Sequence, residues 1–535
     1  MPDEMQDDAH ERKRYDDVRE RLVRDFGFKR AGDRSQFLRK GRCPECGEKS
    51  LFTDYDKPKT LKCGRENNCA AVIYVRERYP DLFDSWSNRY KATEKNPNAA
   101  ADAYLSEGRG FDLTRLRGHY SQEWHQDQEQ GIGTATVRFR LPNGCWWERF
   151  IDKPERFGGQ KAKFAYGKDP SGEWWHLPGG ADWPSELWLV EGIFDAIALE
   201  HHGIAARSIM SCNNYPEAAL ERLRIAASAA NKPLPSLVWA LDSDKAGQEY
   251  AVRWHKRAKE DGWKSSAAVI PARGRNKIDW NDAHQSGKLT PKDCAAYRYE
   301  GALLVAATPS EKARLIYNHT GRAAFHFGHN NCLYWYSYNE AAFNEAKEQI
   351  TKGGTDLSDE EVRDEALTRS ATIKRLVPCY PEPLYFQASR LTDESWYYYR
   401  ISFPDGRKPE KATFTAAQLA SAAEFKKRLL SVASSAVFVG STPQLDHINS
   451  VMMEGIKTVE TINYVGYASD HKCYVFGNVA VKDGVAYKRN DDDYFDIGRL
   501  SIKTLAESLK LNINTKRSLA LLAIQKRCNH SLAVR

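Results

Sequence analysis

Apolar and polar positions follow different patterns in successive parts of the chain. Residues 1–40 are charged, and the segment 14–28 is predicted to form a helix. Between about residues 103 and 300, short apolar runs alternate with helical patterns, which is typical of an α/β unit. Beyond residue 310 the density of Tyr, Trp and Phe rises, and strands joined by glycine-containing hairpins are expected. The pattern predicts a multidomain protein that combines α/β and α+β regions.

Changes in composition divide the chain into four predicted regions. The polar stretch 91–102 is expected to be a linker, and the segment 307–314 marks a second change of character. Within the last region, residues 353–376 are predicted to form a loop followed by an exposed helix. The predicted regions are residues 1–95, 96–180, 181–305 and 306–535.

Two strand–turn–helix patterns place acidic residues at the ends of predicted strands. The apolar run 187–190 predicts a strand, Glu191-Gly192 a turn, and a helix begins at Ile193. The apolar run 237–241 predicts a second strand, which is followed by Asp242, Asp244 and another helix. Residues two apart on an extended chain lie on one side, so both aspartates can face one site. The carboxyl ends of strands are where α/β sheets bind their ligands.

Composition and charge exclude several classes of protein. With 41% hydrophobic and 11% aromatic residues among 535, the chain can form several cores and is not disordered. No run of 18 apolar residues predicts a membrane span, and the charged start lacks the apolar segment of a secretory signal. We therefore expect a cytoplasmic protein without a membrane partner. The net charge of +7 hints at a nucleic-acid partner, and 11 cysteines favour metal ligands or reduced thiols over disulfides.

Four cysteines have the spacing of a zinc site. Cys43, Cys46, Cys63 and Cys69 form the pattern C-x2-C-x16-C-x5-C, which suits one tetrahedral, structural Zn²⁺. Residues 51–63 between the pairs predict a hairpin, and the whole predicts a zinc ribbon. Its lysines and aromatic residues suit single-stranded nucleic acid. Two alternatives stay open: four reduced cysteines without a metal, and a structural zinc without a nucleic-acid role.

The acidic residues near the predicted strand ends require a compensating charge. Glu191, Asp195, Asp242 and Asp244 would repel one another unless a cation lies between them. Oxygen ligands without His or Cys favour Mg²⁺ or Mn²⁺, which serve phosphoryl or nucleotidyl transfer. The alternative is that Asp242 and Asp244 only begin a loop and cap the next helix.

These motifs resemble the Toprim domain of primases, topoisomerases and some nucleases. The matching segments are residues 190–195 and 241–247, and residues 276–282 resemble the K-D-W-N-D segment of many primases with Ile278 inserted. The resemblance implies that Glu191 is a general acid or base and that Asp242 and Asp244 hold the catalytic cation. The full implied set of cation ligands comprises Glu191, Asp195, Asp242, Asp244 and Asp279.

The residues before the Toprim motif resemble the basic subdomain that opens a bacterial primase core. Residues 103–116 resemble its Y-L-x-x-R-G segment, with Arg109-Gly110 as the R-G, and residues 135–167 are similar to its strand–hairpin–strand segment. Residues 131–168 carry eight Lys and Arg against three Asp and Glu, a local charge of +5. An ordinary basic, solvated sheet remains the alternative. The resemblance implies that the residues that bind nucleic acid or nucleotide are Arg109, Arg149, Lys161, Lys163 and Lys245.

The order of regions resembles a bacterial or phage-type DNA primase over about residues 40–300. The resemblance implies a zinc-ribbon DNA-binding domain, a primase core with a Toprim α/β domain, and a C-terminal α+β region of unassigned role. It implies an enzyme that joins nucleoside triphosphates into short RNA primers on single-stranded DNA, with a replicative helicase as a candidate partner. Residues 437–452 and 460–484 resemble the segment before the motor of mobile-element primase–helicases, yet no G-x4-G-K-[ST] occurs.

Two other functions stay open. A Toprim nuclease or topoisomerase would cleave DNA, although a topoisomerase needs a nucleophilic Tyr and none can be assigned. A zinc–Toprim recombination mediator would bind single-stranded DNA without catalysis. Its DNA binding would survive the loss of Asp242 and Asp244.

Overall fold

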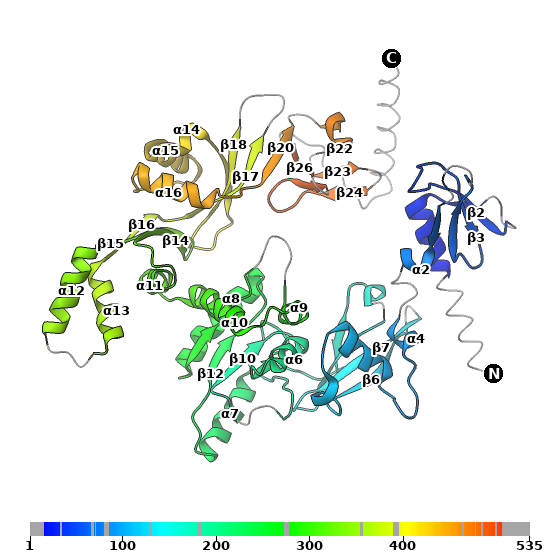
Figure 1. The fold of residues 1–535 in the computed structure, drawn as a ribbon, viewed down its shortest axis with the longest axis horizontal. Helices are drawn as coiled ribbons and strands as arrows, with labels where there is room; N and C mark the ends of the chain where they lie inside the picture. Colours follow the sequence, from blue (N-terminus) through cyan, green and yellow to red (C-terminus); the bar gives the residue numbers. More distant parts are fainter. Residues whose placement is uncertain are drawn as a thin grey trace. The chain divides into compact units, whose positions relative to one another are not determined.

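The fold is that of a computed structural model, which covers most of the chain. It describes residues 15–504 apart from residues 31, 33–34, 66–68, 70, 80–84, 129–130, 153, 180–182, 272–277, 354–356, 389–394, 463–464, 477, 483–484 and 498–499. The chain divides into two compact units, residues 1–305 and 306–535 (Figure 1). Within the described residues, no helix combines the length and the apolar character that crossing a bilayer requires.

The N-terminal part of the first unit is a small antiparallel sheet packed on one helix. The helix covers residues 15–26, within the segment predicted to be helical. Val18 and Leu22 are fully buried and pack against Leu38, Leu51 and Leu61 of the sheet. The strands lie in chain order: β1 (Lys29–Arg30), β2 (Phe37–Gly41), β3 (Leu51–Asp54), β4 (Thr60–Cys63) and β5 (Val72–Tyr74). A short helix, α2 (Val75–Arg78), follows them.

A second antiparallel sheet follows. The helix before it shows that the predicted linker, residues 91–102, extends too far. Residues 99–102, expected to be part of a linker, belong to helix α5 (Ala99–Ala103). The small side chains of Ala100 and Ala101 are fully buried, and their N–H groups donate to Gln122 Oε1 at 2.8 and 3.0 Å. The sheet has the order β6-β7-β8-β9. Its elements are α4 (Trp86–Arg89), η1 (Tyr104–Gly108), η2 (Leu113–Arg115), β6 (Tyr120–Asp127), β7 (Ile132–Arg140), β8 (Trp146–Phe150), η3 (Pro154–Phe157) and β9 (Ala162–Phe164).

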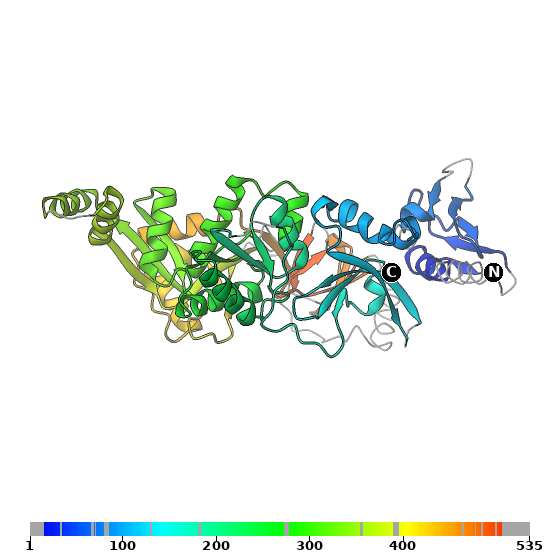
Figure 2. The same cartoon turned by 90° about the horizontal axis from the view of Figure 1, so that it is seen from below.

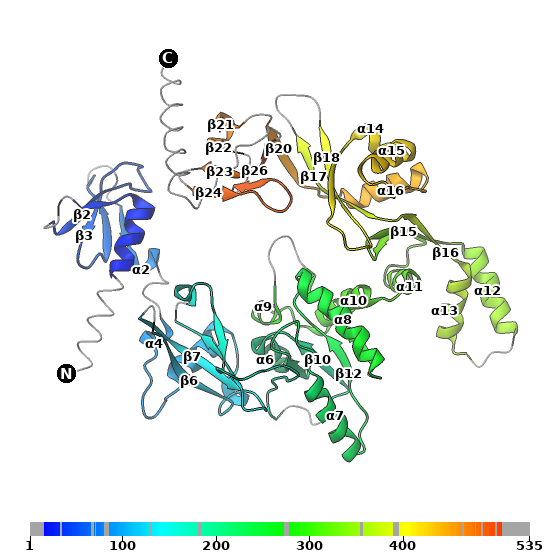
Figure 3. The same cartoon turned by 180° about the vertical axis from the view of Figure 1, so that it is seen from behind.

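The third part of this unit is a four-stranded parallel sheet with helices on both faces (Figure 3). Trp188 and Val190 pack towards α6 and α9, whereas Leu187 and Leu189 pack towards α7 and α8. Such strands are apolar on both faces because both faces are covered. The strand order is β11-β10-β12-β13. The elements are β10 (Glu186–Val190), α6 (Ile193–His201), β11 (Ala206–Ser208), α7 (Glu217–Ala229), β12 (Ser236–Trp239), α8 (Lys245–Glu260), β13 (Ser265–Ala267), α9 (Trp280–Gln285) and α10 (Pro291–Val305).

One hydrophobic core joins the second and third parts of the unit. The rings of Phe139 on β7 and Trp147 on β8 lie 6.1 and 5.7 Å from the ring of Phe194 on α6. One face of the β6–β9 sheet therefore packs on the helix that follows β10. This packing holds residues 99–177 against the parallel sheet.

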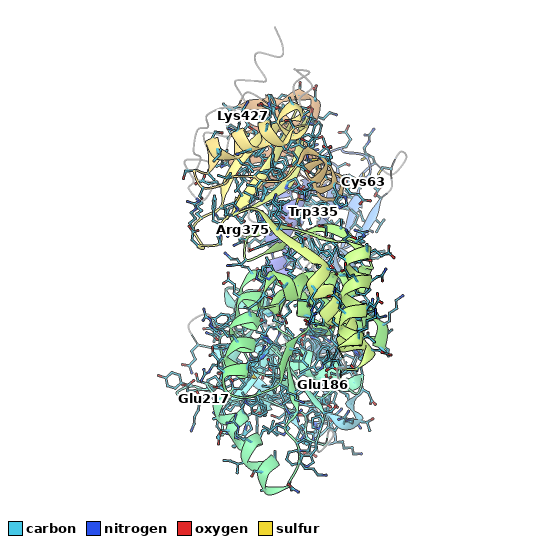
Figure 4. The ribbon with its side chains drawn as sticks, turned by 90° about the vertical axis from the view of Figure 1, so that its left-hand side faces the viewer. Cys63, Glu186, Glu217, Trp335, Arg375 and Lys427 are labelled. Carbon is cyan, nitrogen blue, oxygen red and sulfur yellow. The ribbon has the colours of Figure 1, made fainter. Side chains whose placement is uncertain are left out.

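The second unit contains three sheets of three, six and four strands. Their orders are β14-β15-β16, β19-β18-β17-β20-β26-β25 and β21-β22-β23-β24. Trp335 and Arg375 are labelled on β15 and β16 in Figure 4. The elements are α11 (Pro309–Thr320), β14 (Ala324–His329), β15 (Cys332–Tyr338), α12 (Glu340–Lys352), α13 (Asp359–Ser370), β16 (Ala371–Val377), β17 (Tyr380–Ala388), β18 (Trp396–Ser402), β19 (Glu410–Thr415), α14 (Ala416–Leu419), α15 (Ala422–Val432), α16 (Thr442–Met452), β20 (Thr458–Ile462), β21 (Gly466–Ala468), η4 (Ser469–His471), β22 (Cys473–Val475), β23 (Val479–Lys482), β24 (Val485–Lys488), β25 (Phe495–Ile497) and β26 (Leu500–Thr504).

One local prediction for this unit is corrected and another is confirmed. The predicted helix within 353–376 is α13, which buries Val362 and Ala366 against α12, whereas residues 371–376 form a strand (Figure 2). The hairpin between β18 and β19 contains Gly406, with φ of +75°, as expected of the glycine-containing hairpins, and the hairpin between β14 and β15 turns at Asn330 and Asn331, with φ of +46° and +51°. Asparagine tolerates this left-handed conformation better than most residues.

Candidate functional site

The four cysteines predicted to bind zinc lie together at one end of the β3–β4 hairpin. Sγ of Cys43 lies 3.8 Å from Sγ of Cys69, and Sγ of Cys46 lies 3.9 Å from Sγ of Cys63. All four sulfurs lie within 4.8 Å of one another. Tetrahedral Zn²⁺ with Zn–S bonds of about 2.3 Å would place its ligands about 3.8 Å apart. The arrangement therefore fits a structural zinc ion; Cys63 is labelled in Figure 4.

A neighbouring hydroxyl makes one of these thiols a better metal ligand. Ser50 Oγ lies 3.0 Å from Cys63 Sγ. This hydrogen bond is the main cause that lowers the pKa of the Cys63 thiol to about 7. Because zinc binds the thiolate, the lower pKa favours the ligating form near neutral pH.

Glu191 lies directly after β10, where the sequence pattern predicts it. Its Oε1 accepts a hydrogen bond from the backbone N–H of Asp242 at 3.0 Å. Strands β10 and β12 are parallel neighbours, with Leu189 opposite Trp239, so both chain segments leave the sheet at the same edge. The first carboxylate is thus held beside the second acidic segment.

Asp195 is buried in the first turn of α6, with 7% of its surface exposed. Its Oδ1 accepts a hydrogen bond from the backbone N–H of Asn281 at 3.1 Å. Burial raises the pKa of the Asp195 carboxyl well above its usual range, and the charges of Asp279 and Asp242 raise it further. A bound cation would relieve this repulsion and favour the ionised carboxylate.

The turn before α6 leaves little room for a side chain at Gly192. A Cβ atom on Gly192 would lie 2.6 Å from Oδ2 of Asp195, which is closer than any relaxed contact. The backbone of Gly192 has φ of −97°, so its conformation alone would admit other residues. The close approach of the Asp195 carboxylate therefore explains the glycine in this motif.

Asp242 and Asp244 follow β12 and differ in their surroundings. Asp242 is half-buried, whereas Asp244 is exposed and is the N-cap residue of α8. Oδ1 of Asp244 accepts a hydrogen bond from the backbone N–H of Gly247 at 2.9 Å. The capping role considered as an alternative is therefore present for Asp244. A cap of this kind uses one carboxylate oxygen and does not exclude a cation on the other.

Asp279 is the N-cap residue of α9. Residues 276 and 277, the first two of the predicted motif 276–282, lie outside the described residues. Oδ1 of Asp279 accepts a hydrogen bond from the backbone N–H of Asp282 at 2.7 Å, which caps the helix. Burial raises the pKa of the Asp279 carboxyl, and the carboxylates of Asp282 and Asp242 add to this effect. Asp195, Asp242 and Asp279 thus influence one another although they come from three separate segments.

The carboxylates form an open cluster, unlike the cysteines. In the part of the chain that the structure describes, only the four cysteines bring three or more metal-ligating atoms within 4.8 Å of one another. A cation among the carboxylates would therefore be held by one or two of them, with water or phosphate oxygens as the other ligands. This is typical of Mg²⁺ sites that bind phosphorylated substrates.

Arg109, one of the predicted basic residues, is linked to this cluster through Asn281. Its Nη1 donates to Asn281 Oδ1 at 3.0 Å, and its Nε and Nη2 donate to the hydroxyl of Tyr104 at 3.0 and 2.7 Å. The guanidinium lies 4.6 Å from the ring centroid of Phe194. Its positive charge opposes the rise in the pKa of the Asp279 carboxyl.

Arg149 lies on the face of β8 that packs on α6, because it is two residues from Trp147. Its Nε is buried and has no hydrogen-bond partner. A buried cationic donor without a protein partner costs free energy.

Lys163 lies on the opposite face of the same sheet and has protein partners. Its Nζ is 3.2 Å from Glu148 Oε1 and 2.7 Å from His125 Nδ1. Glu148 is 1% exposed and also pairs with Arg138 at 2.9 Å. The predicted positive charge of this region is therefore partly neutralised by one buried carboxylate.

The remaining predicted basic residues are exposed. Lys161 precedes β9, and its side chain is exposed. The side chain of Lys245 is 90% exposed, and its Nζ lies 3.8 Å from Glu249 Oε1. The structure thus brings Arg109 to the carboxylates and leaves Lys161 and Lys245 at the surface.

Sequence reasoning missed three residues that organise the site. Asn281 contacts both Arg109 and Asp195, Tyr104 holds Arg109, and Glu148 pairs with two basic residues. Asn281 lies inside the matched D-W-N-D segment, which could have signalled it. Tyr104 is the Tyr of the segment Y-L-S-E-G-R-G, which resembles the primase Y-L-x-x-R-G, and Glu148 is an acidic residue within a basic strand.

Comparison with known proteins identifies one domain. Residues 188–284 match a family model described as Toprim-like, which covers β10 to α9 and contains all five predicted cation ligands. No curated protein matches the chain. The RNA polymerase domain of the Mycobacterium tuberculosis primase DnaG is similar, with 14% identity and a TM-score of 0.29 over 46% of this chain and 90% of that one.

Two further solved structures are similar. One contains the zinc-binding and RNA polymerase domains of the Aquifex aeolicus primase, with 14% identity and a TM-score of 0.29 over 58% of this chain and 92% of that chain. The other is the M. tuberculosis domain in complex with a double-stranded DNA oligomer with a 6-nucleotide overhang. It is 16% identical with a TM-score of 0.29, over 43% of this chain and 86% of that one.

Proposed function

We propose that the chain, whose residues 188–284 form a Toprim-like domain, is a DNA primase. It would be a nucleotidyltransferase that joins ribonucleoside triphosphates on a single-stranded DNA template. The observation that carries the proposal is that Arg109, from the preceding region, donates to Asn281 Oδ1, while the backbone N–H of Asn281 donates to Asp195 of the Toprim-like domain. A guanidinium next to cation-binding carboxylates suits a phosphorylated substrate.

The acidic residues would hold Mg²⁺ or Mn²⁺, with each cation held by one or two carboxylates of the proposed ligand set Glu191, Asp195, Asp242, Asp244 and Asp279. The burial of Asp195 and Asp279 and their repulsion from Asp242 fit a divalent cation. When bound, the cation would stabilise the negative charge that develops on the reacting phosphate. Glu191, Asp242 and Asp244 are the proposed catalytic residues, and the hydrogen bond from Asp242 N–H keeps the Glu191 carboxylate directed into the site.

The reaction would form a phosphodiester bond. The 3′-hydroxyl of one nucleotide attacks the α-phosphate of the next, the bond to the β-phosphate breaks, and pyrophosphate leaves. Glu191 would accept the proton of the hydroxyl. Arg109 and Arg149 would bind phosphates of the nucleotide or the template, since Arg109 is joined to Asp195 through Asn281 and Arg149 lies on the sheet face that packs on α6.

The zinc ribbon would contribute to template binding, with Cys43, Cys46, Cys63 and Cys69 holding one Zn²⁺. Lys161, Lys163 and Lys245 are further proposed contacts to nucleic acid, although Lys163 would first have to leave Glu148. A replicative helicase is a proposed partner, and replication in the cytoplasm is the proposed setting.

Primer synthesis tests this function. Purified full-length protein is incubated with single-stranded templates, labelled ribonucleotides, and Mg²⁺ or Mn²⁺. Short, template-dependent products that disappear in Asp242→Asn support the proposal. Glu249→Gln is the matched control, because it also removes one negative charge near the start of α8 but lies outside the carboxylate cluster. Nicking of a supercoiled plasmid without any primer synthesis would instead indicate a Toprim nuclease.

A further inference from the structure

Helix α9 binds three successive backbone carbonyls of a segment that precedes it by more than 170 residues. Gln285 Nε2 donates to Gly108 O at 2.9 Å, and Asn281 Nδ2 donates to Arg109 O at 3.1 Å. His284 Nε2 lies 2.9 Å from Gly110 O. Since a carbonyl only accepts, Nε2 of His284 carries the proton. The segment 108–110 and α9 are therefore joined by one continuous row of hydrogen bonds.

Asn281 is the member of this row that reaches both the acidic cluster and the basic residue. Its backbone N–H donates to Asp195 Oδ1, and its side-chain Oδ1 accepts from Arg109 Nη1 at 3.0 Å. Only 1% of its surface is exposed. One buried residue thus connects the carboxylate of Asp195 to both the main chain and the guanidinium of Arg109.

The other partners of Arg109 are uncharged. They are the hydroxyl of Tyr104 and the ring face of Phe194. Within the described residues, no carboxylate oxygen lies within 4.0 Å of the guanidinium, in contrast to Arg138 and Lys163. Neutral partners fix the orientation of the guanidinium without neutralising its charge, and an arginine has five N–H donors to share.

We propose that Asn281 is a positioning residue that holds Arg109 at a set place beside the carboxylate cluster, so that the guanidinium and the cation bind the same nucleoside triphosphate. This inference rests on the proposed function and names the substrate of that site. An amide is required because it accepts from Nη1 and donates to Arg109 O at the same time. An aspartate would lose the donor and would neutralise Arg109.

A double-mutant cycle tests the inference. Asn281→Ala, Arg109→Ala and the double variant are compared with wild type, because residues that act through one another are not additive. The backbone N–H that reaches Asp195 is retained in Asn281→Ala. We measure KM and kcat for primer synthesis, the equilibrium affinity for labelled Mg·ATP, and Tm. Ser286→Ala is the control on the same helix, since its hydroxyl contacts only carbonyls of α9.

In Asn281→Ala we expect KM and the dissociation constant of Mg·ATP to rise on the order of tenfold, with kcat changed less. The double variant should be no weaker than Arg109→Ala, and Asn281→Asp should weaken nucleotide binding because it neutralises Arg109 and removes the donor to Arg109 O. Independent losses that multiply in the double variant, or equal losses in Ser286→Ala, would overturn the inference. A wild type that binds Mg·ATP but makes no primer overturns the proposed function alone. A wild type that does neither overturns both.

Discussion

The backbone N–H of Asp242 donates a hydrogen bond of 3.0 Å to the Oε1 atom of Glu191, 51 residues earlier in the chain. This contact connects the two acidic motifs of the parallel sheet directly. It orients Glu191 through the main chain of the second motif, so replacing the Asp242 side chain leaves the hydrogen bond in place. Asp242 and Glu191 can therefore be tested separately.

Two substitutions of Asp244 should separate its effect on catalysis from its effect on stability. Asp244→Asn should keep the cap on α8, because asparagine is an equally good N-cap, whereas Asp244→Ala should lower the free energy of unfolding by about 1 kcal/mol. Both variants remove a negative charge from the cation site, so both should reduce primer synthesis by about a hundredfold or more. Urea unfolding and primer assays on the two variants check this. Full activity in Asp244→Asn would show that Asp244 serves only as a helix cap.

The cysteine cluster should hold one zinc ion per chain. Each of Cys43, Cys46, Cys63 and Cys69, changed to Ser, should lower the zinc content measured by atomic emission. Loss of the metal should unfold residues 15–79, because the core of this region is small and includes Cys43 and Cys63. Protection of its amides from hydrogen exchange is the readout. Cys294 lies outside the cluster, so Cys294→Ser should leave the zinc content unchanged.

Removal of the Glu148 charge should release two basic side chains. In Glu148→Gln, Arg138 and Lys163 lose their shared carboxylate and become available to phosphates. The affinity for single-stranded DNA should rise, and its dependence on log[salt] should steepen by up to about 1.4, at about 0.7 per phosphate contact. Fluorescence anisotropy across a salt series measures both quantities.

Glu221→Gln on α7 is the matched control for Glu148→Gln, since it removes an exposed charge elsewhere in the same unit. If the two variants have the same affinity and salt dependence, this face of the β6–β9 sheet does not contact DNA. Tm is measured in parallel, because removing one partner of a buried ion pair also costs stability.

Loss of the Lys503 proton should make the second unit more stable at mildly alkaline pH than at pH 7. Its side chain is 8% exposed, donates to Tyr385 OH at 3.1 Å and lies 3.4 Å from the ring centroid of Tyr398. Burial lowers the pKa of Lys503 to about 8. Between pH 8 and the ordinary lysine pKa near 10.5, the unfolded chain binds more protons than the folded one, so stability rises with pH.

Lys503→Met should abolish this rise and should stabilise the unit at pH 7. A shift of about 2.5 pKa units corresponds to about 3 kcal/mol as an upper bound. Urea unfolding of the full chain at pH 7, 8 and 9.5, followed by hydrogen exchange in β17 and β26, measures the effect. A wild-type stability that falls over this range would contradict the prediction.

The elements that carry the chemistry could be predicted from local spacing. The interval between Cys43 and Cys46 defines a turn, and the sequence 187–195 defines a strand, a turn and a helix that leave Glu191 at the strand end. These features depend on residues within a few positions of one another, for which side-chain periodicity is sufficient. Local composition was misleading at residues 99–102, where a polar stretch hides alanines that pack into the core.

Which basic residues face the site could not be predicted in this way. Arg109 and Lys163 look alike in the sequence, yet one has neutral partners and the other shares a buried carboxylate. The difference arises from Asn281, which is 172 residues from Arg109, and from Glu148 on the neighbouring strand. The free energy of a charge depends on its partners and burial, and both are set by which distant segments pack together. The primary structure thus specifies the residues able to bind a cation and phosphate, and long-range packing selects those that share a site.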